Sequence, residues 1–107
     1  MVVMAVELNP QQFLKLTQSD FVLVDFWAAW CVPCQKMTPI LLACERELPQ
    51  LKVGRLNVDQ YPHLTQKLGV QGLPTLILFK HGEPVSWVTG FQPKDRLLGY
   101  LRQKVAL

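Results

Sequence analysis

Two cysteines, Cys31 and Cys34, stand three residues apart, with Pro33 between them and Trp30 directly before them. Thiol–disulfide exchange needs one thiolate that attacks a disulfide and a second thiol that releases the product. Residues at positions i and i+3 of a helix lie about 5–6 Å apart, which is within the range of a disulfide. The pair is therefore a candidate redox dithiol.

The two cysteines are expected to differ in exposure and reactivity because a helical pattern begins where they stand. Free N–H groups and the positive end of the dipole at a helix start favour the ionised form of Cys31. Cys34 begins the inward apolar stripe of the same helix and should be the more buried of the two. This pattern assigns Cys31 as the nucleophile and Cys34 as the resolving thiol.

Zinc binding and a purely structural bridge are the alternatives for this pair. Zinc would need two further Cys or His ligands, and Cys44, His63 and His81 lack ligand-like spacing. A structural bridge between near neighbours closes only a small loop and adds little stability. We therefore expect no metal and assign no role to the histidines. Cys44 falls on the inward helical stripe, which predicts a small, buried and inert side chain.

A single carboxylate, Asp25, interrupts an apolar run over residues 21–27. The run is typical of a central strand that is covered on both faces. A buried, unpaired carboxyl group usually has a raised pKa, and beside a dithiol it can take the proton of Cys34, directly or through a water. Alternatively, Asp25 only accepts a backbone N–H near the end of the strand. The sequence leaves both interpretations open.

The rest of the chain reads as strands and helices that support this site. Early strands and helices alternate, which favours parallel crossovers, whereas a tight turn at 81–83 makes the last two strands antiparallel. We therefore predict one α/β domain over residues 1–107, with a mixed sheet of about five strands and helices on both faces. The predicted segments are a strand over 1–6, a helix over 11–17 after Asn9–Pro10, a strand over 21–27, a helix over 33–48, a strand over 51–59, a helix over 61–67, strands over 75–79 and 84–89, and a helix over 93–105.

Bulk properties exclude several classes of protein. The chain has 107 residues, half of them hydrophobic, which suits one domain with a core. A net charge of +3 and scattered lysines argue against nucleic-acid binding. The apolar runs are too short to span a membrane, and the N-terminus lacks the pattern of a secretory signal. We expect a cytoplasmic protein, or one inside an organelle if a transit peptide has been removed, without nucleic-acid or membrane partners.

The stretch from Val24 to Cys34, which reads VDFWAAWCVPC, resembles the active-site signature of the thioredoxin family. Residues 72–75 resemble the loop before the family's third strong strand, 79–83 its late hairpin, and Pro39 the bend in its helix. The likeness runs from about Val6 to the C-terminus.

This resemblance implies the thioredoxin fold, with four helices around the sheet, and a monomer that reduces protein disulfides. Cys31 and Cys34 would alternate between a dithiol and a redox disulfide, with Asp25 as the third catalytic residue. The electron donor would be a separate thioredoxin reductase, because the chain has no nucleotide or flavin fingerprint and we expect it to hold no cofactor.

The resemblance also implies a substrate-binding surface around the dithiol. It implies that Leu73–Pro74 is a cis peptide facing the dithiol and that the Leu73 backbone pairs with an extended substrate segment. From the residues alone, a packing role for any member of this surface stays open. The implied members are Trp30, Val32, Pro33, Gly72, Leu73, Pro74 and Gly90.

Two residues depart from the family's pattern. Val32 stands where the family usually has glycine, and its β-branched side chain adds bulk beside the nucleophile. Arg55 stands where many relatives have lysine. An arginine would favour ionised Asp25 if it reaches that group, and otherwise it points to solvent.

Two other functions compete with the reductase. A non-catalytic interaction module would keep the fold and use the surface around Trp30 and Pro74 for docking, but the presence of both cysteines and Asp25 argues against it. A dithiol oxidase or isomerase is the third hypothesis. The absence of a signal peptide and of a histidine between the cysteines argues against that one.

Overall fold

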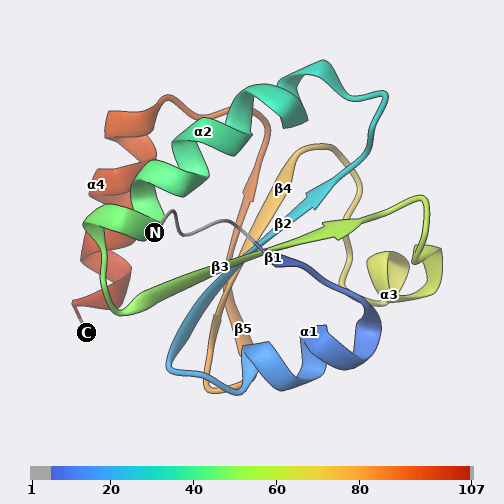
Figure 1. Ribbon diagram of the computed structural model, residues 1–107, viewed down its shortest axis with the longest axis horizontal. Helices are drawn as coiled ribbons and strands as arrows, with labels where there is room; N and C mark the ends of the chain where they lie inside the picture. The colour runs from blue at the N-terminus through green and yellow to red at the C-terminus, as the bar shows by residue number, and fades with distance from the viewer. Residues whose placement is uncertain (1–5, 107) are drawn as a thin grey trace.

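A five-stranded sheet runs through the middle of the chain, with helices on both of its faces (Figure 1). The computed structural model describes residues 6–106, and none of the helices within this range is long and apolar enough to cross a membrane. The order of elements agrees with the prediction. The elements are β1 (Val6–Glu7), α1 (Pro10–Thr17), β2 (Phe21–Trp27), α2 (Val32–Glu47), β3 (Leu51–Asn57), α3 (Pro62–Lys67), β4 (Thr75–Lys80), β5 (Glu83–Thr89) and α4 (Lys94–Val105).

The strand that carries Asp25 lies at the centre of the sheet, whose order is β1-β3-β2-β4-β5. Strands β1, β3 and β2 are parallel, whereas β4 and β5 run antiparallel to their neighbours. The predicted mixed sheet is confirmed. β5 lies at an edge of the sheet, as Pro84 near its start predicts. Proline has no backbone N–H to donate to a neighbouring strand, so it is confined to edge strands and strand starts.

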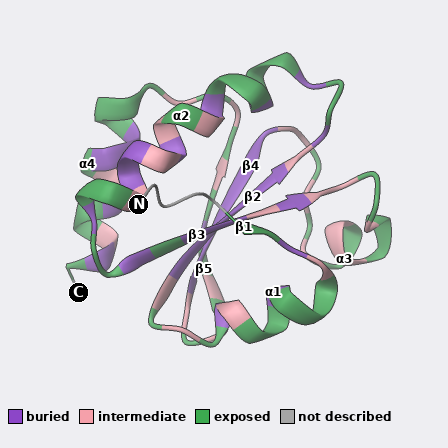
Figure 2. Cartoon of the chain, viewed as in Figure 1, coloured by how far each residue is buried: buried purple, intermediate pink, exposed green. Residues whose placement is uncertain are grey.

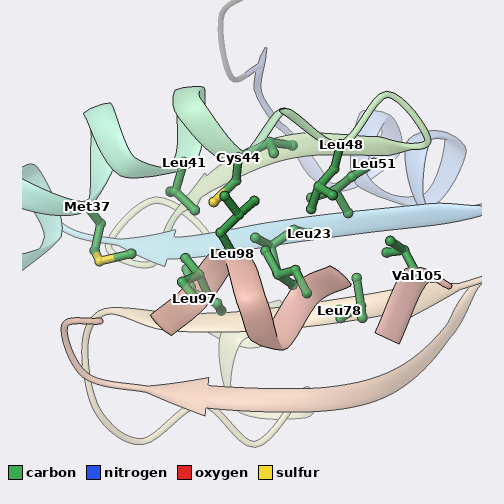
Figure 3. Packing of buried hydrophobic residues seen from close by; sticks show 13 residues of the cluster. Leu23, Met37, Leu41, Cys44, Leu48, Leu51, Leu78, Leu97, Leu98 and Val105 are labelled. Carbon is green, nitrogen blue, oxygen red and sulfur yellow. The ribbon is translucent and has the colours of Figure 1, made fainter. Parts of the chain in front are cut away.

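The helices cover β2 from both faces, which explains why its sequence is almost continuously apolar (Figure 2). Val22, Val24 and Phe26 pack with α1 and α3, and Leu23 packs with α2 and α4. Figure 3 shows the cluster that contains Leu23, in which Leu41 and Cys44 of α2 lie close to leucines of α4 and of the sheet. The strand is therefore held rigidly by two separate cores.

Side chains that bond to the backbone set the start of α1, which agrees with the expected opening at Asn9–Pro10, and the end of β3, which does not. Helix α1 begins at Pro10 because the Asn9 side chain accepts the N–H of Gln12 at 2.8 Å and the Gln12 side chain accepts the N–H of Asn9 at 3.0 Å. The predicted extension of β3 to Asp59 is wrong, because the Asn57 side chain accepts the N–H of Asp59 at 2.9 Å and turns the chain. Of the first predicted strand, 1–5 lies outside the described residues.

The core beneath α2 makes a direct prediction. Leu41 is completely buried against α4 and the sheet, so Leu41→Ala should lower the free energy of unfolding by roughly 2–5 kcal/mol. The matched change Leu14→Ala, on a side chain that is 61% exposed, should alter it by less than about 0.5 kcal/mol. Urea unfolding of the two variants measures both values, and equal losses would contradict this packing.

Candidate active site around the disulfide at the start of α2

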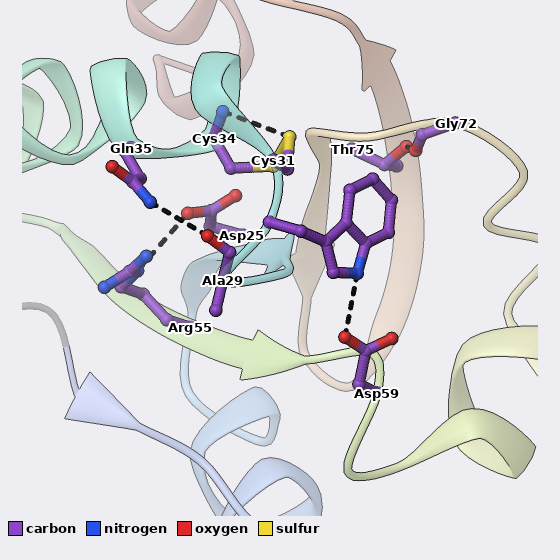
Figure 4. Close-up of a disulfide and its surroundings, with 10 residues drawn as sticks. Asp25, Ala29, Cys31, Cys34, Gln35, Arg55, Asp59, Gly72 and Thr75 are labelled. Carbon is purple, nitrogen blue, oxygen red and sulfur yellow. Dashed lines mark hydrogen bonds and ion pairs between the residues drawn. A yellow bond between two sulfur atoms is a disulfide. The ribbon is translucent and has the colours of Figure 1, made fainter.

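Cys31 and Cys34 form a disulfide at the N-terminus of α2, with their Cα atoms 5.3 Å apart (Figure 4). Cys31 is the N-cap residue, and its Sγ accepts the backbone N–H of Cys34 at 3.2 Å. Cys34 is completely buried, whereas Cys31 keeps 5% of its surface exposed. The spacing inferred from the sequence and the order of burial are both confirmed.

The segment between β2 and α2 positions the disulfide. The N–H of Cys31 bonds to the carbonyl of Ala28 at 3.1 Å, which closes a tight turn, and Ala28 is completely buried. Trp30 is 69% exposed, but its Nε1 donates to Asp59 Oδ2 at 2.9 Å. Asp59 was not identified from the sequence, since it stands after β3, far from the cysteines along the chain.

Asp25 is completely buried on β2, and in Figure 4 it lies between the disulfide and Arg55. Its Oδ2 accepts a long hydrogen bond from Arg55 Nε at 3.4 Å, and its Oδ1 has no partner among residues 6–106. Burial raises the pKa of Asp25 to about 7, although the charge of Arg55 and its hydrogen bond act in the opposite direction. This carboxyl group can therefore exchange a proton near neutral pH.

The surroundings of Asp25 and Arg55 bear on the alternatives that the sequence left open for each. No backbone N–H within the described chain bonds to the Asp25 side chain, so a role limited to such a bond is wrong. Arg55 does not point to solvent, because its side chain is only 15% exposed and contacts Asp25. It also bonds to Glu7 and lies 4.3 Å from the centre of a ring of Trp27. Nothing in the sequence pattern singled out Glu7.

The loop before β4 packs against the disulfide. The Leu73–Pro74 peptide is cis, as the resemblance implied, and Leu73 contacts the apolar cluster that contains both cysteines. The carbonyl of Pro74 accepts the N–H of Gly90 at 2.8 Å, which joins this loop to the end of β5. Gly90 has φ of 92°, a conformation that suits glycine.

The predicted docking residues are exposed to different extents. Val32 is 60% exposed and Pro33 is exposed beside it, whereas Gly72, Leu73 and Gly90 are half-buried. Pro74 is buried, so it lies beneath the exposed residues of this surface. Phe91, which directly follows Gly90, is 43% exposed and was not among the predicted docking residues.

The third cysteine lies apart from the site. Cys44 is a free, completely buried thiol in the cluster between α2 and α4, as predicted, and burial raises its pKa to about 11. Within residues 6–106, no group of three or more His, Cys, Asp or Glu side chains is arranged to hold a metal ion.

Known proteins are similar to this chain in both sequence and architecture. The family model described as Thioredoxin matches residues 4–103. A thioredoxin of Alicyclobacillus acidocaldarius is 47% identical over 84% of this chain and 88% of its own, and one of Staphylococcus aureus is 43% identical over 86% and 89%. A solved mutant thioredoxin of Halobacterium salinarum superposes with a TM-score of 0.86 at 33% identity, covering 94% of this chain and 89% of its own.

Burial of Asp25 should make stability fall as the pH rises. The unfolded chain loses this proton near the ordinary pKa of 3.8, whereas the folded protein keeps it to about pH 7. The free energy of unfolding therefore falls as the pH rises from about 3.8 to about 7, and it stays at the lower value above that pH. Asp25→Asn should therefore raise the free energy of unfolding of the oxidised protein by up to about 4 kcal/mol at pH ~8 and change it little at pH ~3.

Urea unfolding of the oxidised protein across this pH range measures the effect. Glu83→Gln, which neutralises an exposed carboxylate at the start of β5, is the matched control and should not show this gain. A stability gain from Asp25→Asn that is the same at every pH would contradict the assignment.

Proposed function

The chain belongs to the thioredoxin family and is a thiol–disulfide oxidoreductase, and from this premise we propose that Cys31 and Cys34 reduce protein disulfides with the help of Asp25. The family acts on protein disulfides and is re-reduced by a reductase. The observation that carries the proposal is the unequal pair at the start of α2, with a buried carboxyl group beside it. Cys31 keeps a small exposed area that a substrate can reach, whereas Cys34 is completely buried.

In the first step, the Cys31 thiolate attacks one sulfur of a substrate disulfide. A new bond joins Cys31 to that sulfur, the substrate S–S bond breaks, and its other sulfur leaves as a thiolate. The N-cap position supports this role, because Cys31 Sγ already accepts the N–H of Cys34 and the helix N-terminus favours negative charge there. Cys34 is fully buried and cannot meet the substrate first.

In the second step, Cys34 resolves the mixed disulfide. The ionised carboxyl group of Asp25 takes the Cys34 proton, directly or through a water, and the resulting thiolate attacks Cys31 Sγ. The bond from Cys31 to the substrate breaks, the substrate leaves as a thiolate, and the Cys31–Cys34 disulfide closes, so two electrons pass to the substrate. The raised pKa of Asp25, about 7, supports this exchange near neutral pH.

A separate thioredoxin reductase then returns the disulfide to the dithiol. This part of the proposal rests on the sequence, which has no nucleotide-binding fingerprint. We further propose that residues 1–107 form one domain that works as a monomer.

Substrates are proposed to dock on the surface around the disulfide, defined by Trp30, Val32, Pro33, Gly72, Leu73, Pro74 and Gly90. Trp30 and Val32 supply exposed apolar area. The Leu73 backbone makes no hydrogen bond to other backbone groups of the described chain, so its N–H and C=O are available to an extended segment. This combination favours a protein substrate over a small molecule.

The cysteine roles are tested with three matched variants. Cys31→Ala should abolish reduction of a disulfide-bonded protein with dithiothreitol as the donor, measured against the uncatalysed rate. Cys34→Ala should accumulate a mixed disulfide through Cys31, visible on a non-reducing gel. Cys44→Ala should stay active, because Cys44 lies in the core away from the disulfide. Activity of Cys31→Ala equal to that of the wild type would refute the enzymatic role.

The docking surface is tested by Trp30→Ala. An exposed aromatic anchor typically contributes more than about 1 kcal/mol to a protein interface, so KM for the protein substrate should rise by about tenfold. The rate with a small disulfide should change much less. Trp87→Ala, at an indole that is 50% exposed on β5, is the matched control. The docking role fails if both tryptophan variants raise KM equally.

A further inference from the structure

Three charged side chains form a row across the sheet beside the disulfide. Glu7 on β1 is in register with Arg55 on β3, and Arg55 is in register with Asp25 on β2. Neighbouring residues in register on parallel strands point to the same face of a sheet, so the three side chains lie next to one another. Their exposure falls along the row, from 53% for Glu7 through 15% for Arg55 to 0% for Asp25.

Arg55, in the middle of this row, contacts both carboxyl groups, but at unequal distances. Its Nη1 lies 3.0 Å from Glu7 Oε2, whereas its Nε lies 3.4 Å from Asp25 Oδ2. The guanidinium group also lies over Trp27, and the Nε1 of Trp27 donates to the other oxygen of Glu7 at 3.1 Å. Glu7 thus uses both carboxylate oxygens to hold the guanidinium and the indole together.

The geometry of the arginine matters because a guanidinium group can bind a carboxylate through two parallel N–H bonds. Such a pair would hold Asp25 strongly in its ionised form and weaken it as a proton acceptor. In the structure only one long bond forms, and Oδ1 of Asp25 has no partner among residues 6–106. The shorter contact of Arg55 is with Glu7.

We propose that Glu7 is a positioning residue that holds Arg55 away from a two-bond pair with Asp25, and so keeps this carboxyl group able to exchange a proton in the resolving step. The inference rests on the role proposed above for Asp25. The exposed residue Glu7 therefore acts, through Arg55, on the ability of the buried Asp25 to exchange a proton.

The groups that face Asp25 can be named element by element. From β1 and β3 the facing groups are Glu7 and Arg55, and within the described chain these are the charges that act on its pKa. At the start of α2 the disulfide lies next to Asp25 (Figure 4), and Cys31 and Cys34 do not titrate while they are joined. From β4 the residue in register is the apolar Leu76. In the oxidised protein, a change in the titration of Asp25 therefore reports on the row.

The test is a carbon-13 NMR titration of the aspartate carboxyl carbons in the oxidised protein. Glu7→Gln should lower the titration midpoint of Asp25, because Arg55 is released toward it, and we expect about a three- to tenfold loss of proton affinity. Glu83→Gln removes an exposed carboxylate at the start of β5 and is the matched control for net charge. Because no turnover is involved, this result is independent of whether Asp25 acts in catalysis.

A second arm separates positioning from simple charge repulsion. Arg55→Gln alone should raise the midpoint of Asp25, and adding Glu7→Gln to it should then have less than about half of its effect in the wild type. This outcome supports the proposal. A midpoint in Glu7→Gln that matches that of Glu83→Gln, a rise instead of a fall, or an equal shift with and without Arg55 would each overturn it.

Discussion

Burial of one carboxyl group beside a disulfide is the constraint that shapes the rest of this protein. Asp25 has no exposed surface and only a long bond to Arg55, so its charged form is poorly compensated. Ionising a group in that position is unfavourable, which raises the pKa of Asp25 to about 7, so the proton is exchangeable near neutral pH. The protein gives up stability at this point, which is typical of residues that serve chemistry.

Two cores, one on either side of β2, make this burial possible. Because helices cover both faces of the central strand, the disulfide turn that follows Trp27 is anchored to a rigid element. Rigid support of this kind keeps the Cys31 Sγ and the N–H of Cys34 in hydrogen-bond contact at the helix start. Cys31 can then keep a small exposed area while Cys34 stays completely buried.

The surface around the disulfide is assembled from three distant segments. The turn before α2 contributes Trp30, the loop before β4 contributes Leu73, and the end of β5 leads into Gly90. One hydrogen bond joins Trp30 to Asp59 in the turn after β3, and another joins Gly90 to Pro74 in the loop before β4. A protein substrate would therefore meet a preformed surface, which lowers the entropic cost of binding.

Features that depend on local spacing could be predicted from the sequence alone. The distance between Cys31 and Cys34, the order of strands and helices, and the isolation of Asp25 in an apolar run all follow from patterns among near neighbours. The inward turn of Arg55 and its contact with Glu7 could not be predicted, and they emerged only in the folded chain. These contacts join residues on three strands, and their formation depends on sheet order and register, which hydrophobic periodicity does not encode.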